Sequence, residues 1–221
     1  MNCFEKFLNL LFPPKCPFCA RVQDSVGICI ACQRDLPWTR ESESRWDGPG
    51  GLHCAAPLWY ENGARKGLLH LKFRGDSAAA EPMGELIARC AAEHFSGGFD
   101  TVTWVPVSRK RLRERGYDQA ELLARAACRQ WETQPEQLLR KTVDTQPQST
   151  LADAAARRAN VLGVYEPVKG ARIEGRRILL VDDIHTTGAT LEECIRVLKD
   201  AGAAEVVCVV AAKTRGLKKL P

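Results

Sequence analysis

The chain has 221 residues, of which 45% are hydrophobic and 27% are charged, and its formal net charge is +5. These values lie near the averages of globular proteins and exclude a disordered or fibrous chain, while the length fits one large domain or one domain with a small appendage. The apolar runs are far shorter than the roughly 20 residues of a transmembrane helix. The mild positive charge permits phosphate-bearing ligands without indicating nucleic acid.

Residues 1–14 predict a short amphipathic helix that packs on the protein, with contact to a membrane surface as the alternative. A secretory signal is not expected, because Glu5 and Asn9 interrupt the apolar run and Pro13 and Pro14 end it. Without an export signal we expect a cytoplasmic protein. In that reducing compartment, cysteines serve more often as metal ligands or core residues than as disulfides.

Four of the ten cysteines form two pairs, each with a two-residue gap: Cys16, Cys19, Cys29 and Cys32. Such pairs are typical of a Zn²⁺ ion held by four thiolates, which leave no position for a substrate, so we expect a structural zinc site. The alternatives are two disulfides or unused buried thiols, and His53 or Cys54 could replace a ligand. The other cysteines are expected in the core: Cys3, Cys54, Cys90, Cys128, Cys194 and Cys208.

A polar segment rich in turn-forming residues, 39–51, follows the cysteines and predicts a boundary between a zinc-binding module over 1–50 and a second domain over 51–221. Within the second domain, strand patterns are expected at 57–60, 101–107, 177–181 and 205–212. Helical patterns are expected at 64–73, 81–95, 118–131 and 190–201. This alternation predicts an α/β fold, with a parallel sheet that carries helices on both faces.

The predicted strand 177–181 leads into Asp182 and Asp183 and then into a turn of small and hydroxyl-bearing residues. In a parallel sheet, ligands bind at the carboxyl ends of the strands. The N–H groups of the turn and of the next helix, with the hydroxyls, can hold a phosphate; the candidates are Thr186, Thr187, Gly188, Ala189 and Thr190. The two carboxylates can accept hydrogen bonds from a ribose diol, so the segment fits a sugar 5-phosphate. In the alternative interpretation, the acids only cap the helix.

This segment resembles the phosphoribosyl pyrophosphate (PRPP) loop of the type I phosphoribosyltransferases. The resemblance implies that Asp182 and Asp183 bind the ribose hydroxyls of PRPP and that residues 186–190 bind its 5-phosphate. One position departs from the pattern, because His185 stands where that family usually has an aliphatic residue. His185 is either a solvent-facing change without consequence or a sign of altered selectivity, and we favour the first interpretation.

A second phosphate site is indicated after the predicted strand 101–107. The candidate pyrophosphate ligands are Ser108, Arg109, Lys110 and Arg111, which we interpret as part of a basic loop, and the Val-Pro-Val-Ser start resembles that of the amidophosphoribosyltransferases. Arginine can bind a diphosphate through two parallel hydrogen bonds. The alternatives are a solvated basic loop or a loop that contacts the backbone of a nucleic acid.

Taken in order, four motifs resemble the competence protein F family (ComF, with the ComFC and GntX-like proteins): the four-Cys module, Leu-Lys-Phe-Arg-Gly at 71–75, Arg-Glu-Arg-Gly-Tyr-Asp-Gln-Ala at 113–120, and the acidic pair with its threonine-rich turn. The resemblance covers nearly the entire chain. It implies a type I phosphoribosyltransferase fold with PRPP and Mg²⁺ as ligands, and a role in DNA uptake or utilisation beside a DNA-translocating helicase. Asp118 stands where the family has Asn, which leaves the contact of that side chain open. Residues expected to support the site, or to form a loop that closes over it, are Lys72, Arg113, Arg115, Gln119, Thr142, Gln146 and Arg157.

Two functions therefore remain open. The first is an enzyme that transfers phosphoribose to a nitrogenous acceptor with release of pyrophosphate, for which no catalytic residue can be assigned. The second is a non-catalytic PRPP sensor that binds single-stranded DNA through the zinc module and the basic loop. Single strands stack on aromatic side chains, but aromatic residues of a small domain are more often part of its core; those in question are Phe18, Trp38, Trp46, Trp59 and Tyr60.

Overall fold

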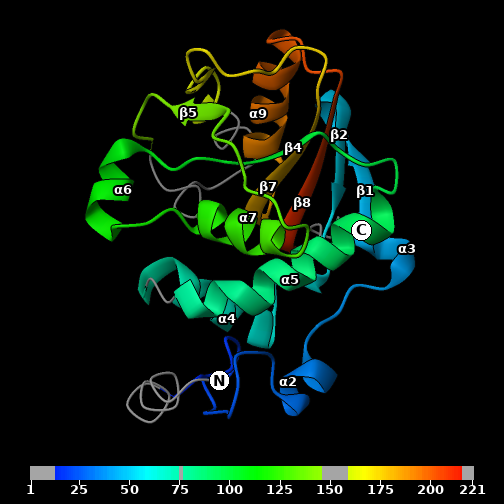
Figure 1. Ribbon diagram of the computed structural model, residues 1–221, viewed down its shortest axis with the longest axis vertical. Coiled ribbons are helices and arrows are strands. Elements are labelled where there is room, and N and C mark those ends of the chain that lie inside the picture. The colour runs from blue at the N-terminus through cyan, green and yellow to red at the C-terminus, as the bar shows by residue number, and fades with distance from the viewer. Residues whose placement is uncertain (1–12, 75–76, 146–158, 216–221) are drawn as a thin grey trace, which may run out of the picture.

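The fold is given by a computed structural model that describes residues 13–74, 77–145 and 159–215. A six-stranded sheet in the order β1-β2-β8-β7-β4, with β3 also paired to β8, lies at its centre (Figure 1). All neighbouring strands are parallel except β1 and β2. The strands are β1 (Arg45–Gly48), β2 (Leu52–Ala55), β3 (Leu58–Trp59), β4 (Thr101–Trp104), β7 (Arg177–His185) and β8 (Glu205–Lys213).

Helices cover both faces of this sheet, as the sequence predicted. On one face pack α4 (Asn62–Arg74), α5 (Ser77–His94) and α7 (Gln119–Arg129), and on the other packs α9 (Ala189–Asp200). Successive residues of a strand point to opposite faces. Accordingly Leu179 and Val181 of β7 belong to the core under α5 and α7, whereas Ile178 and Leu180 belong to the core under α9. Figure 1 shows α9 in the upper part of the view and α4 and α5 in the lower part.

The segment after β4 differs from its prediction as a basic loop, because residues 109–115 form a short helix, α6 (Arg109–Arg115). Its first turn is capped by Ser108, whose Oγ accepts a hydrogen bond from the N–H of Arg111 at 3.3 Å. It ends at Gly116, which has a left-handed φ of +80°. Strand β4 also stops at Trp104, three residues earlier than expected, and β7 continues to His185, so the acidic pair lies inside the strand.

Several short elements were not predicted. Two small helices, α2 (Ile30–Asp35) and α3 (Glu41–Ser44), precede the sheet, and a 3-10 turn, η1 (Pro49–Gly51), connects β1 to β2. The strands β5 (Leu139–Lys141) and β6 (Tyr165–Pro167) form a separate antiparallel pair. Strand β1 lies within the polar segment 39–51 and has little apolar pattern, so its pairing with β2 comes from tertiary contacts. In the parts of the chain that the structure describes, no helix is long and apolar enough to cross a membrane.

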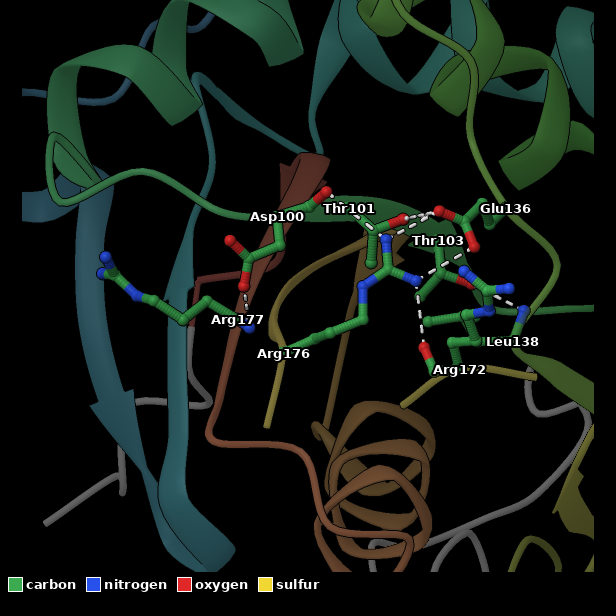
Figure 2. Close-up of polar contacts among 8 residues, drawn as sticks. All are labelled: Asp100, Thr101, Thr103, Glu136, Leu138, Arg172, Arg176 and Arg177. Atoms are coloured by element: carbon green, nitrogen blue, oxygen red, sulfur yellow. Dashed lines mark hydrogen bonds and ion pairs between the residues drawn. The ribbon is translucent and has the colours of Figure 1, made fainter. Parts of the chain in front are cut away.

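A polar network joins the amino ends of β4 and β7 (Figure 2). Arg176 donates two hydrogen bonds to the carboxylate of Glu136, at 2.7 and 3.0 Å, and Thr101 donates a third to the same carboxylate at 3.0 Å. The Asp100 carboxylate accepts a bond from the N–H of Arg177 at 2.7 Å. These bonds link the segments at which both strands begin, next to the first backbone pair between Thr101 and Ile178.

The network predicts a loss of stability in acid. Hydrogen bonds from Arg176 hold the pKa of Glu136 below its usual value. A carboxyl whose pKa is lowered in the folded state stabilises the protein above its unfolded pKa, and this contribution disappears as the pH falls through the folded pKa. Because Glu136 is half exposed, we expect Glu136→Gln to lower the free energy of unfolding by at most about 1 kcal/mol at pH 7.

This loss should shrink when urea unfolding is repeated near pH 3. The matched control is Glu114→Gln, an exposed glutamate of α6, which should leave the stability unchanged at both pH values. An equal loss at pH 7 and pH 3 for Glu136→Gln would contradict the proposed role of the ion pair.

Candidate functional site

The four paired cysteines come together in one cluster, in which all four sulfur atoms lie within 4.8 Å of one another. Cys29 caps α2, and its sulfur accepts a hydrogen bond from the N–H of Cys32 at 3.5 Å. The Cys19 and Cys29 sulfurs are 3.6 Å apart. Tetrahedral Zn²⁺ with Zn–S bonds of 2.3 Å places its sulfurs about 3.8 Å apart. The cluster therefore fits a structural zinc ion.

The alternative zinc ligands are wrong. His53 pairs through Nδ1 with Asp47 at 2.7 Å, and Cys54 is fully buried in the sheet, so neither belongs to the cluster. The four clustered cysteines are free thiols rather than disulfides. The remaining described cysteines are buried, as expected for core residues, namely Cys54, Cys90, Cys128, Cys194 and Cys208; Cys3 lies outside the described residues.

The acidic pair is buried near the carboxyl end of β7. Asp182 and Asp183 are each only 9% exposed, and the Asp182 carboxylate accepts a hydrogen bond from the N–H of Asp183 at 2.8 Å. Burial, and then the neighbouring Asp183 charge, raise the pKa of Asp182 well above its usual value. A ligand that donates hydrogen bonds or brings a cation would relieve this unfavourable burial.

The motif at 113–120 reaches the acidic pair through Gln119. The Gln119 side chain donates to the Asp183 carboxylate at 3.3 Å and accepts from Arg115 at 3.3 Å. Thus α6 and the first residue of α7 connect to the end of β7, although 64 residues separate Gln119 from Asp183. Arg113 points elsewhere, since it is exposed and donates to the carbonyl of Arg109.

The predicted 5-phosphate turn connects β7 to α9. Gly188 occupies the N-cap of α9 with a left-handed φ of +84°, and a Cβ atom there would lie 3.1 Å from Nε2 of His185. The left-handed φ favours glycine, and a side chain here would also crowd the His185 ring. Thr186 is exposed and Thr187 and Thr190 are half-buried, while Ala189 packs in the core. The turn thus leaves its polar groups near the carboxyl edge of the sheet.

The interpretation of His185 as solvent-facing is wrong. Its ring is half-buried and packs edge-on against Trp46, with the ring centroids 4.9 Å apart. Burial, and then the nearby charge of Lys213, lower the pKa of His185 to about 4. The imidazole is therefore neutral at physiological pH and contributes packing beside the turn.

The predicted pyrophosphate residues lie around an acidic side chain that the sequence did not single out. Ser108 donates to the Asp144 carboxylate at 2.5 Å, and the Lys110 ammonium lies 3.5 Å from the same carboxylate. Arg111 donates to the carbonyl of Thr145 at 2.7 Å, whereas Arg109 is exposed on α6. Asp144 was missed because its partner is 36 residues away and a single acidic residue in a polar segment has no motif.

Lys141, at the end of β5, is a second residue of this region that was not among the predicted ligands. Its backbone forms an isolated parallel β-bridge with that of Ser108, and its ammonium donates a hydrogen bond to the Thr145 hydroxyl at 2.8 Å. Burial, and then the charge of Arg111, lower its pKa to about 8, while Asp144 and Asp182 act in the opposite direction. Lys141 therefore interacts electrostatically both with residues 108–111, here called the basic group, and with the acidic pair.

The other expected supporting residues divide into two groups. The Thr142 side chain donates to the carbonyl of Val164 at 3.2 Å, which is a contact within the fold, and Lys72 is half-buried on α4. Gln146 and Arg157 lie outside the described residues. Among the aromatic candidates, Phe18 and Trp59 are core residues, whereas Trp38 is 37% exposed, and Trp46 and Tyr60 are half-buried.

Comparison with known proteins gives a consistent result. Residues 132–221 match the phosphoribosyl transferase domain, and residues 7–45 match the double zinc ribbon domain. The chain is 26% identical to the competence protein ComFC of Bacillus subtilis, with 87% of this chain and 74% of that protein covered. It is 28% identical to the ComFC of Streptococcus pneumoniae, with 86% and 77% covered.

The chain is thus similar to proteins of the ComF family over most of its length. A further relative is the DNA utilization protein YhgH of Escherichia coli O157:H7, which is 32% identical over 48% of this chain and 46% of that protein. The four-Cys cluster coincides with the matched zinc ribbon. The acidic pair and its turn lie inside the matched phosphoribosyl transferase domain, whereas α6 and the start of α7 precede it.

The ComF pattern has Asn where this chain has Asp118, and the structure gives the aspartate a defined contact. One carboxylate oxygen accepts from the N–H groups of Ala120 and Glu121 at the start of α7, and the other accepts from the N–H of Val107 at 2.8 Å. An asparagine in this position has only one acceptor oxygen. Burial raises the pKa of Asp118 to about 6, although the three N–H groups oppose that shift.

The cysteine cluster predicts that one zinc ion stabilises the amino-terminal part of the chain. Cys16→Ser should lose most of the bound zinc and lower the midpoint of thermal unfolding, because structural zinc binding contributes directly to folding. The control is Cys90→Ser, a buried cysteine outside the cluster, which should keep the zinc. Metal analysis of both purified variants and calorimetry would measure this, and equal zinc contents would refute the assignment.

Proposed function

We propose that the carboxyl edge of the sheet binds PRPP. The observation that carries the proposal is the convergence of segments distant in the sequence: Gln119 donates to Asp183, Gly188 caps the helix that follows β7, and Lys141 at the end of β5 pairs with Ser108. The ribose of PRPP needs hydrogen-bond acceptors, its 5-phosphate needs N–H and hydroxyl donors, and its pyrophosphate needs basic side chains. The matched phosphoribosyl transferase domain supports the same ligand.

In this proposal each group of residues binds one part of PRPP. Asp182 and Asp183 accept hydrogen bonds from the ribose hydroxyls. The N–H groups and hydroxyls of 186–190, at the start of the 12-residue helix α9, bind the 5-phosphate, where the helix dipole favours an anion. Ser108 and the basic side chains of α6 bind the pyrophosphate.

Mg²⁺ fits the same site, because two adjacent buried carboxylates repel each other and oxygen ligands suit this ion. Asp182 and Asp183 are the residues that would hold it, and when bound the ion neutralises charge on the diphosphate.

In a transfer reaction the bond from ribose C1 to pyrophosphate breaks and a nitrogen of the acceptor bonds to C1. The chain contributes by positioning the ribose and by stabilising the charge of the leaving pyrophosphate.

We further propose that this activity serves DNA uptake or utilisation in the cytoplasm, next to a DNA-translocating helicase. Support comes from the names of the relatives, two of which are competence proteins and one a DNA utilization protein.

We also propose that the chain divides into the zinc-binding module, 1–50, and the phosphoribosyltransferase-like domain, 51–221.

A non-catalytic sensor that binds single-stranded DNA is the second candidate, and one surface favours it. Phe73, at the end of α4, is 67% exposed, and the Arg115 guanidinium lies over its ring at 5.7 Å. Arg109, Lys110 and Arg113 are exposed on the adjoining helix α6. An exposed aromatic ring beside basic side chains suits a single strand, whose bases stack and whose phosphates need cations.

The PRPP proposal predicts saturable binding of PRPP with Mg²⁺ to the zinc-loaded protein in a calorimetric titration. Asp183→Asn should weaken this binding at least about tenfold, because a charged acceptor of ribose hydrogen bonds is lost. The control is Asp200→Asn, an exposed residue at the end of α9, which should bind like the wild type. The absence of binding by calorimetry and by a second method would overturn the proposal.

The second candidate predicts that labelled single-stranded DNA binds with an affinity that falls steeply with salt. Phe73→Ala should weaken it by about 1–3 kcal/mol, the usual value of one base–aromatic stack. Leu162→Ala removes a comparably exposed apolar side chain, 69% exposed, from another part of the surface and serves as the control. If fluorescence anisotropy detects no difference between the two variants, the DNA surface is not at Phe73.

A further inference from the structure

The basic group after β4 already holds acceptors that belong to the chain itself. Ser108 donates its hydroxyl to one oxygen of Asp144 at 2.5 Å, Lys110 lies 3.5 Å from the other oxygen, and Arg111 Nε lies 4.0 Å from the first. The next residue, Thr145, accepts from Arg111 through its carbonyl at 2.7 Å and from Lys141 through its hydroxyl at 2.8 Å. Four donors thus converge on two consecutive residues.

These contacts exclude simultaneous binding of a diphosphate by the same atoms. A serine hydroxyl has a single hydrogen to donate, so Ser108 cannot serve Asp144 and a phosphate oxygen at the same time. The carboxylate of Asp144 also carries a negative charge, which repels a second anion in the same place. A diphosphate can therefore bind these atoms only after the Asp144 carboxylate has left them.

Asp144 can leave this position without disturbing the core. It follows the last residue of β5 by three positions and its side chain is 35% exposed. The ladder between β5 and β6 ends at Lys141 and Tyr165. Among the described residues, the contacts that hold Asp144 are with Ser108, Lys110 and Arg111, as expected of a replaceable anion.

We propose that Asp144 and Thr145 are internal occupants of the pyrophosphate subsite, and that a diphosphate ligand binds by displacing them from Ser108 and Arg111. The inference rests on the proposed PRPP site and adds a selectivity residue to it. The apparent affinity of any ligand that enters this subsite is reduced by the fraction of molecules in which Asp144 has left. A ligand confined to the 5-phosphate turn is not affected.

The experiment is a calorimetric titration of the full-length, zinc-loaded protein with inorganic pyrophosphate, and separately with ribose 5-phosphate, each with and without Mg²⁺. The variants are Asp144→Asn, which keeps the shape and removes the charge, and Asp144→Ala, which removes both. We expect both to bind pyrophosphate at least about threefold more tightly than the wild type, since a competing exposed ion pair has been removed. Ribose 5-phosphate should bind equally to all three proteins.

Asp35→Asn is the matched control, because it also removes one exposed carboxylate that pairs with an arginine, here Arg34 on α2. It should leave pyrophosphate affinity unchanged, which separates a local effect from the change in net charge. Thermal unfolding of the variants checks that Asp144→Asn keeps the fold, and Asp144→Ala provides the second test.

Equal or weaker pyrophosphate binding by both Asp144 variants, with normal binding by the wild type, would overturn the inference and leave the PRPP proposal standing. Weaker binding only with Mg²⁺ would also overturn it, because Asp144 would then assist the ligand. If no protein binds either pyrophosphate or ribose 5-phosphate, the PRPP site itself fails.

Discussion

The burial of two adjacent carboxylates at the end of the central strand is the constraint on which the site depends. Asp182 and Asp183 lie in β7 just beyond its last pair with β4, where β7 is still paired with β8, and both are buried. Burying a charge is costly unless hydrogen bonds or opposite charges compensate for it. The surrounding structure supplies the N–H of Asp183, the amide of Gln119 and the field of Lys141.

The start of α7 is also held in place by a buried carboxylate that needs hydrogen-bond donors, that of Asp118. Asp118 caps this helix and binds the N–H of Val107, directly before Ser108. One carboxylate therefore fixes both the helix that carries Gln119 and the segment that carries the basic group. Aspartate suits this double contact because both of its oxygens accept hydrogen bonds, whereas the amide nitrogen of asparagine would face a donor. This gives a physical reason for the departure from the ComF pattern.

Local patterns were sufficient for elements whose partners are close in sequence or whose periodicity is strong. The gaps of Cys16–Cys19 and Cys29–Cys32 predicted the metal cluster, and the apolar strands and amphipathic helices predicted a parallel sheet covered on both faces. They did not predict α6, because five basic residues in seven positions were interpreted as a loop that binds pyrophosphate. Only the cap at Ser108 and the stop at Gly116 identify it as a helix.

The sequence by itself determined which reactive groups this protein carries: four paired thiolates that fit zinc, two adjacent acids followed by a glycine turn, and a run of basic residues. These depend on residue type and short spacing, which the chain carries directly. Only the tertiary structure decided that His185 packs against Trp46 instead of facing solvent, and that Gln119 reaches Asp183. It also decided that Asp144 occupies the basic group, because contacts between residues 36 or 64 positions apart arise from the packing of strands and helices and leave no periodic pattern.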